Sequence, residues 1–207
     1  MPLPLQHFYM IRHGETEANR ARVIAGSTDS PLTDKGRLQA QRAQKIVENL
    51  TIKPTQIIHS NLSRARDTAL TINQNLRLPT FENPDYAEWH FGSWEGMAFD
   101  DYFGDNKHHK PNDWPDPPGD GETQDQFTKR VQLAKTAALS NHPPALVVSH
   151  GGVFRAFGLL YGRIGALIDN CVLYEFKPTD HAPFPWEILR HDENGAESVT
   201  LFEPMET

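Results

Sequence analysis

The sequence has one cysteine, no long apolar run and no excess of positive charge. Cys171 alone cannot form a disulfide within the chain, so the fold must be held together by a hydrophobic core, and 207 residues are enough to bury one. Residues 1–10 lack the basic flank, apolar stretch and cleavage site of a secretory signal. No stretch reads as a membrane span. We therefore expect a cytoplasmic protein that does not act on membranes.

Acidic residues outnumber basic ones, 27 against 20, which gives a formal net charge of -7. A chain with this charge repels nucleic acid and anionic lipid as a whole. Any anion that it binds must therefore be attracted by a local cluster of positive groups. This directs the search to a small basic pocket in an acidic protein.

Segments typical of strands alternate with segments typical of helices. We expect strands at 6–12, 55–59, 145–149, 171–176 and 186–189, and helices at 34–50, 62–76, 122–139 and 153–161. This alternation predicts an α/β fold, a three-layer sandwich with a mostly parallel central sheet flanked by helices, in a single domain over 1–207. The segment at about 83–121 is rich in Pro, Gly, Asp, Trp and His and is expected to be an irregular loop that contacts the substrate.

Three of the predicted strands end in residues that suit an anion. They lead into Arg12-His13-Gly14-Glu15, into His59-Ser60 and on to Arg64, and into Ser149-His150-Gly151-Gly152. In open α/β sheets ligands bind at the carboxyl ends of the strands. Arginine holds phosphate oxygens in a planar fork, histidine can attack phosphorus or donate a proton, and glycine lets backbone N–H groups approach. The set suits a phosphate ester and needs no metal ion.

With these motifs, the sequence resembles the histidine phosphatase superfamily, which includes cofactor-dependent phosphoglycerate mutases and many phosphatases. The resemblance covers roughly the first three quarters of the chain, in four motifs with the same order and spacing. They are Arg12-His13-Gly14-Glu15-Thr16 with Asn19 and Gly26, Ser60-Asn61-Leu62-Ser63-Arg64-Ala65 with Thr68-Ala69, Glu88 to Gly96, and Ser149-His150-Gly151-Gly152.

The resemblance implies a role for each residue that matches the family's pattern. His13 would be the nucleophile, phosphorylated on its ring. The phosphoryl group would be bound by Arg12, Arg64 and His150, with further hydrogen bonds from Asn19 and the backbone of Gly151. The resemblance implies the phosphoglycerate mutase-like version of the three-layer fold and requires no cofactor.

Glu88 matches the family's acidic residue, the general acid for the leaving alcohol and then the base for water. A carboxyl group is needed there because an alkoxide leaving group must be protonated. From the residues alone Asp85 and Glu95 are equally available, so the assignment to Glu88 depends on the resemblance.

Two departures favour a phosphatase over a mutase. The family's mutases have an arginine directly after the acid, where this chain has Trp89, and they place further basic residues after it to hold a second anion. Here the segment 97–119 contains Lys107-His108-His109-Lys110 and no arginine. Lysine does not replace the bidentate fork of arginine. The cluster 107–110 is either a solvated loop or a contact with the substrate.

The sequence therefore predicts a metal-independent phosphatase that hydrolyses small phosphate monoesters through a phosphohistidine on His13. A mutase-type phosphotransferase and a catalytically silent phosphate-binding protein are the alternatives. A serine hydrolase with Ser149 as nucleophile is disfavoured because the pattern G-x-S-x-G is missing. The expected partner is a small phosphate ester, not nucleic acid, and a homodimer is compatible with the sequence.

Overall fold

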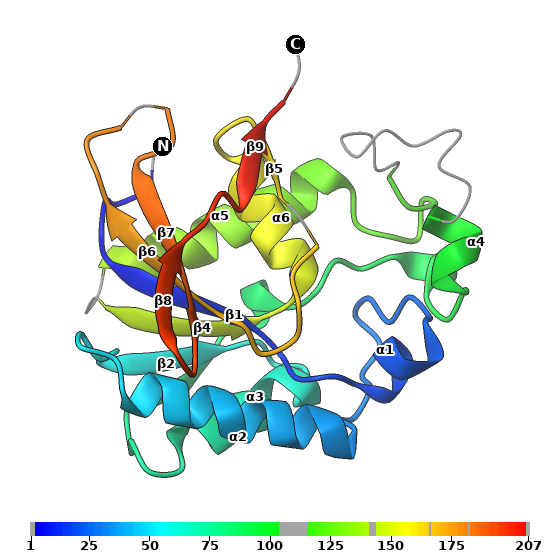
Figure 1. The fold of residues 1–207 in the computed structure, drawn as a ribbon. Helices are drawn as coiled ribbons and strands as arrows, with labels where there is room; N and C mark the ends of the chain where they lie inside the picture. The colour runs from blue at the N-terminus through cyan, green and yellow to red at the C-terminus, as the bar shows by residue number, and fades with distance from the viewer. Residues whose placement is uncertain (1–2, 104–115, 141–143, 166, 182, 206–207) are drawn as a thin grey trace.

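A computed structural model describes residues 3–103, 116–140, 144–165, 167–181 and 183–205 (Figure 1). A seven-stranded sheet has the order β3-β2-β4-β1-β6-β7-β8. Its strands are β1 Phe8–Arg12, β2 Gln56–His59, β3 Thr80–Glu82, β4 Ala145–Ser149, β6 Leu173–Pro178, β7 Trp186–Asp192 and β8 Gly195–Ser198. The first four neighbours are mutually parallel, whereas β6 is antiparallel to β1, β7 to β6 and β8 to β7. β7 thus runs with the parallel group, and the mostly parallel sheet that the sequence predicts is confirmed.

Both faces of the sheet are covered, because successive side chains of a strand point to opposite sides. Phe8 and Met10 of β1 pack in one hydrophobic core, and Tyr9 and Ile11 in the other. The first core contains α5 Gln124–Ser140 and α6 Gly151–Leu159, and the second contains α2 Asp34–Glu48 and α3 Ser63–Asn73. Figure 1 shows these two helix pairs on opposite sides of the strands, which is the predicted three-layer arrangement.

The helix boundaries follow from local hydrogen bonds. α2 begins after Thr33, whose hydroxyl accepts a hydrogen bond from the Gly36 N–H over 3.0 Å. α6 begins at Gly151, two residues before the start at 153 that apolar spacing predicts, so Gly151 and Gly152 belong to its first turn. The short helix α1 Glu17–Ala21 has no buried residue and was not expected. It is held by a capping box between Thr16 and Asn19.

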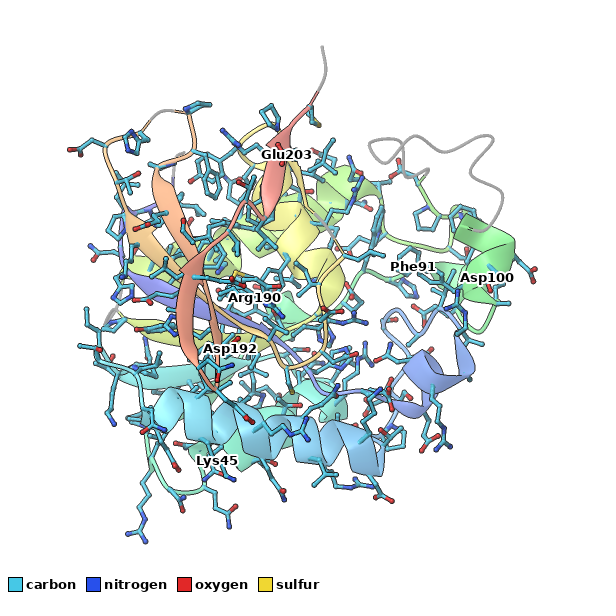
Figure 2. The ribbon with its side chains drawn as sticks, viewed as in Figure 1. Lys45, Phe91, Asp100, Arg190, Asp192 and Glu203 are labelled. Atoms are coloured by element: carbon cyan, nitrogen blue, oxygen red, sulfur yellow. The ribbon has the colours of Figure 1, made fainter. Side chains whose placement is uncertain are left out.

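In its described residues 83–103 and 116–121, the segment expected to be irregular contains three short elements, η1 Pro84–Tyr86, η2 Gly92–Trp94 and α4 Phe99–Phe103. The cluster 107–110 lies outside the described residues. A small second sheet pairs β5 Arg163–Gly165 with β9 Phe202–Pro204. Figure 2 shows Phe91 and Asp100 at the end of the molecule where β1 leads into α1, far from Arg190 and Asp192 on β7. Within the described ranges, no helix is long and apolar enough to cross a membrane.

A buried carboxylate lies on the antiparallel side of the sheet. The side chain of Glu175 on β6 accepts hydrogen bonds from the Nε2 atoms of His7 and His191 over 2.7 and 2.6 Å. Lys177 Nζ lies 4.0 Å from it. Burial raises the pKa of Glu175, but the hydrogen bonds from His191 and His7 and the charge of Lys177 outweigh that effect and lower the pKa to about 2.

We expect Glu175→Gln to lower the free energy of unfolding at pH 7 by about 2 kcal/mol, because two hydrogen bonds to a charged acceptor are weakened. The pKa of Glu175 is lower in the folded chain than in the unfolded one, so this stabilisation is complete above about pH 4.5 and is lost as the pH falls toward 2. Urea unfolding at pH 7 and pH 3 measures it. A difference between variant and wild type that does not shrink at pH 3 would contradict the assignment.

Candidate active site

A cavity of about 390 Å³ opens at the carboxyl ends of β1 and β4. Its polar lining includes Arg12, His13, Asn19, Arg64, Glu88 and Gly151, and its apolar lining includes Val23, Ile24, Phe91, Phe99, Leu167 and Ile168. Seven of the sequence-predicted positions therefore meet at one place, since His150 packs directly behind the polar lining with its ring centroid 5.1 Å from that of His13. β2, β4 and β1 are neighbours in the sheet, which is why Arg64, His150 and His13 converge.

His13 follows β1 and is buried, with 3% of its surface exposed. Its Nδ1 lies 2.7 Å from the carbonyl oxygen of Gly14. A carbonyl only accepts, so Nδ1 carries the proton and Nε2 keeps a free lone pair. The backbone of His13 is also held, because Asn170 Nδ2 donates to its carbonyl oxygen over 2.8 Å. The ring is thus fixed in the tautomer of a nucleophile.

His150 has the opposite tautomer. Arg64 Nε donates to His150 Nδ1 over 3.3 Å, so Nδ1 accepts and the proton lies on Nε2. Among the described residues, the buried Nε2 has no hydrogen-bond partner. A buried donor without a partner is costly and calls for an explanation, such as a ligand oxygen. His13 and His150 therefore offer an acceptor nitrogen and a donor nitrogen side by side.

Both rings are held neutral. Burial, then the charges of Arg12 and Arg64, lower the pKa of His13 well below its usual range, against a small opposing effect of the hydrogen bond to Gly14. Burial and then the charge of Arg64 lower the pKa of His150 in the same way. A neutral ring is what a nucleophilic nitrogen requires, because a protonated one has no lone pair.

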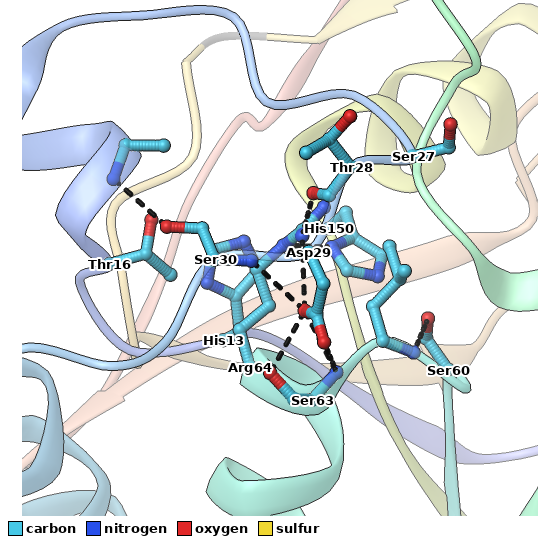
Figure 3. Close-up of polar contacts among 12 residues, drawn as sticks. His13, Thr16, Ser27, Thr28, Asp29, Ser30, Ser60, Ser63, Arg64 and His150 are labelled. Carbon is cyan, nitrogen blue, oxygen red and sulfur yellow. Dashed lines mark hydrogen bonds and ion pairs between the residues drawn. The ribbon is translucent and has the colours of Figure 1, made fainter.

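Arg64, at the start of α3, is anchored by backbone carbonyls. Its Nη2 donates to Gly26 over 2.6 Å and its Nη1 to Thr28 over 2.9 Å. Nη1 also lies 3.8 Å from the carboxylate of Asp29. Figure 3 shows that the same carboxylate accepts hydrogen bonds from Ser63, the first residue of α3. One loop thus fixes both the guanidinium and the helix that carries it.

Arg12, the last residue of β1, is held from the other side of the cavity. Its Nη1 donates to the carbonyl oxygen of Ile168 over 2.6 Å. Its buried Nε has no hydrogen-bond partner among the described residues. The Nε lies 3.9 Å from the position that a Cβ would take at Gly151, so the guanidinium is adjacent to the N-terminus of α6. Backbone N–H groups at a helix N-terminus favour an anion, and the arginine reinforces this.

Glu88 faces this cluster from the loop before η2. Its Oε1 accepts from the Trp89 N–H over 2.9 Å and its Oε2 from the Gly152 N–H over 3.1 Å. A Cβ at position 152 would lie 2.2 Å from Oε1, so only glycine lets the carboxylate approach α6. Asp85 and Glu95 are not among the residues that line the cavity. Of these three acids, only Glu88 lines the cavity.

The side chain of Asn19 takes part in the capping box of α1, which limits how it could bind an anion. Its Oδ1 accepts from the Thr16 N–H over 3.2 Å in the capping box, so only Nδ2 can serve an anion, as a donor.

Trp89, where the family's mutases have arginine, is 1% exposed and stacks on Phe127 with ring centroids 5.6 Å apart. Its Nε1 donates to the carbonyl oxygen of Glu122. This indole packs the loop onto the domain and does not line the cavity.

Sequence reasoning missed several residues that hold the site. The hydroxyl of Thr68 accepts from the Gly14 N–H over 3.1 Å and donates to the carbonyl oxygen of Arg64 over 2.7 Å, so it joins the loop after β1 to α3. Thr68 was noted as part of a motif without a role, and Asn170 was not noted. The only available signal for Asn170 was its place just before a predicted strand.

The comparisons with known proteins agree with this geometry. The family model of the histidine phosphatase superfamily (branch 1) matches residues 8–197. The adenosylcobalamin/alpha-ribazole phosphatase of Salmonella typhimurium is 32% identical over 162 residues, 75% of this chain and 78% of that protein. A probable phosphoglycerate mutase of Photorhabdus laumondii is 32% identical over 195 residues, 86% of each. The crystal structure of the alpha-ribazole phosphatase from Shigella flexneri has a TM-score of 0.69 and 26% identity, covering 84% of this chain and 91% of that one.

We expect inorganic phosphate to bind in the cavity and to stabilise the fold. At about 10 mM phosphate and a dissociation constant of about 1 mM, the melting temperature should rise by about 4 °C relative to chloride of equal ionic strength. Arg64→Lys should lose most of this rise, because lysine lacks the fork that spans the anion and the two carbonyls.

Arg66→Lys is the matched control. It lies two residues further along α3, where Arg66 is half-exposed and pairs with Asp67. This variant should keep the full phosphate-dependent rise in a thermal unfolding measurement. Equal losses in the two variants would show that the effect is not specific to the cavity.

Proposed function

We infer that this chain, which belongs to the histidine phosphatase superfamily, hydrolyses small phosphate monoesters through a phosphohistidine on His13. The observation that carries the proposal is the pair of neutral histidines with opposite tautomers, set between two guanidinium groups. One ring nitrogen can attack phosphorus, while the other can donate to an oxygen of the same phosphoryl group. A metal ion is not needed for either step, because the two arginines supply the positive charge.

In the first step the phosphoryl oxygens would be bound by Arg12, Arg64, His150 Nε2–H, Asn19 Nδ2 and the Gly151 N–H. His13 Nε2 forms a bond to phosphorus as the ester P–O bond breaks, and the electron pair leaves with the alcohol oxygen. The alcohol takes the proton held on the Glu88 carboxyl group. The charge that develops on the equatorial oxygens is stabilised by fixed donors in a site largely shielded from water.

In the second step the now ionised Glu88 takes a proton from water as the water oxygen attacks phosphorus. The P–N bond breaks, His13 recovers its lone pair and inorganic phosphate leaves. One residue serves as acid and then as base because water enters from the side that the alcohol has left. Hydrogen bonds from two backbone N–H groups keep the carboxylate in place through both steps.

A phosphatase is favoured over a mutase by the position of Trp89. The family's mutases have an arginine there, whereas this indole is buried against Phe127 and offers nothing to a second anion. The relative from Photorhabdus laumondii keeps the mutase as the second candidate. A substrate panel of sugar phosphates, nucleotides, phosphoamino acids and α-ribazole phosphate, assayed beside phosphoglycerate mutase activity, separates the two.

We expect His13→Ala to reduce phosphate release from an aryl phosphate by about 1,000-fold or more, because the nucleophile is lost. Substrate labelled with radioactive phosphorus should label the wild-type protein after a rapid alkaline quench. The label should be lost in acid, as expected for a phosphohistidine, and a chelator should not change the rate.

His59→Ala is the control for the trapping experiment. His59 is also a buried strand-end histidine, with Nδ1 2.8 Å from the carbonyl oxygen of the next residue, but it does not line the cavity. The His59→Ala protein should be labelled to the same extent as the wild type. Labelling that survives in His13→Ala would place the covalent intermediate elsewhere, and a wild type that releases no phosphate from any ester in the panel would favour a phosphate-binding protein.

We expect Glu88→Gln to slow the first step, transfer of the phosphoryl group to His13, by an amount that depends on the leaving group. Alkyl phosphates, whose alcohol must be protonated, should lose about 100-fold or more in kcat. p-Nitrophenyl phosphate needs no acid in the first step, so the variant should release about one nitrophenol per protein in a burst and then stall before hydrolysis. Asp85→Asn, at a neighbouring exposed acid outside the cavity wall, should behave as the wild type in stopped-flow measurements. An equal loss in the rate of the first step for all leaving groups would remove Glu88 from the acid role.

A further inference from the structure

The guanidinium of Arg64 is held by a loop that has no helix or strand of its own. The two carbonyl groups that it contacts belong to Gly26 and Thr28. Loops are more mobile than helices and strands, so other contacts must hold these two carbonyl groups in place. Two backbone hydrogen bonds attach its start, from the Gly96 N–H to the Ile24 carbonyl over 2.7 Å and from the Ile24 N–H to the Met97 carbonyl over 2.9 Å.

The loop itself is fixed by the carboxylate of Glu95. Oε1 accepts from the N–H and the hydroxyl of Ser27 over 2.8 and 2.9 Å, and from the Phe91 N–H over 3.1 Å. Oε2 accepts from the Thr28 N–H over 2.9 Å and from the Thr28 hydroxyl. Five donors therefore converge on one carboxylate, which joins the loop 26–28 to the turn that begins at Phe91.

The fit between the loop and this carboxylate is close. Gly26 has φ of +55°, and a Cβ there would lie 2.4 Å from Glu95 Oε1. A side chain at position 26 would have to push the carboxylate away and adopt a backbone conformation that L residues rarely use. The peptide whose carbonyl binds Arg64 is thus packed directly against Glu95.

We propose that Glu95 is a positioning residue that sets the catalytic geometry through Arg64. It does not line the cavity and so does not touch the substrate. Its contacts fix the loop 26–28, the carbonyl groups of that loop fix the guanidinium, and Arg64 Nε fixes the tautomer of His150. The importance of this chain of contacts for turnover rests on the proposed phosphatase function, whereas its effect on phosphate binding and on the His150 ring does not.

A carboxylate suits this place because all five groups around it are donors. Glutamine has nearly the same shape, but one oxygen is replaced by an NH₂ group, which turns donors toward the N–H groups of Ser27 or Thr28. Part of the loop must then move. Hydrogen bonds to a charged acceptor are also stronger than those to an amide.

The experiment compares Glu95→Gln with wild type in three measurements. We expect isothermal titration calorimetry to show inorganic phosphate binding about tenfold more weakly, as for the loss of one hydrogen bond to a charged group. The ¹⁵N shifts of the His150 ring should move from a pure Nε2–H tautomer toward a mixture. kcat for an aryl phosphate should fall by a similar factor or more.

Glu175→Gln is the matched control, since it also removes a carboxylate that accepts several hydrogen bonds but lies on the antiparallel side of the sheet. It should lose stability while its phosphate affinity, His150 tautomer and kcat stay at wild-type values. Glu95→Asp keeps the charge on a side chain one methylene shorter, and it should recover part of the phosphate affinity that Glu95→Gln loses.

The outcomes separate this inference from the proposed function. If Glu95→Gln keeps wild-type phosphate affinity and an unmixed His150 tautomer, the positioning role is wrong, whatever happens to its melting temperature. If both change while wild type hydrolyses no ester, the positioning role stands and the phosphatase assignment fails. If Glu175→Gln changes the same readouts equally, the effect is a general loss of stability and the role is again wrong.

Discussion

Two guanidinium groups beside one cavity, that of Arg64 buried and that of Arg12 partly buried, are the constraint on which the rest of this structure depends. Removing each charge from water is costly, and the pKa of both arginines is lowered, first by burial. Arg12 and Arg64 are stabilised by carbonyl groups of Ile168, Gly26 and Thr28. Burial, reinforced by the positive charge of the arginines, lowers the pKa of the adjacent histidines and keeps them neutral. The same charge that makes the site costly to form makes it suited to an anion.

Three acidic groups near the arginines accept hydrogen bonds from other groups of the site. Asp29 lies 3.8 Å from Arg64 but is shared with the start of α3, and Glu95 is occupied by the loop 26–28. Glu88 is within electrostatic reach of both arginines and is bound by backbone N–H groups. In the mechanism proposed above Glu88 transfers the proton, while Asp29 and Glu95 hold the loop and the helix that position Arg64.

The sequence predicted the layers and most of the site because the relevant signals are local. Buried strands such as 145–149 are apolar up to their last residue, and the residues that follow them are glycine, histidine and arginine, whose chemistry is specific. The exposed edge strand β8 was missed, since its residues Gly195–Ser198 show no apolar alternation. α1 was missed because its stability comes from a capping box and not from a buried face. The role of Glu95 could not be read from the sequence, because it depends on contacts with residues 27 and 28, almost seventy positions away.

The contact between Arg12 and the Ile168 carbonyl joins residues 156 positions apart. The anion-binding groups therefore come together only when segments from the beginning, middle and late part of the chain have all been placed. A nascent chain still lacking residue 168 would contain His13 and both arginines without the contact that orients Arg12. During synthesis the cavity would thus remain incomplete until residue 168 has emerged from the ribosome.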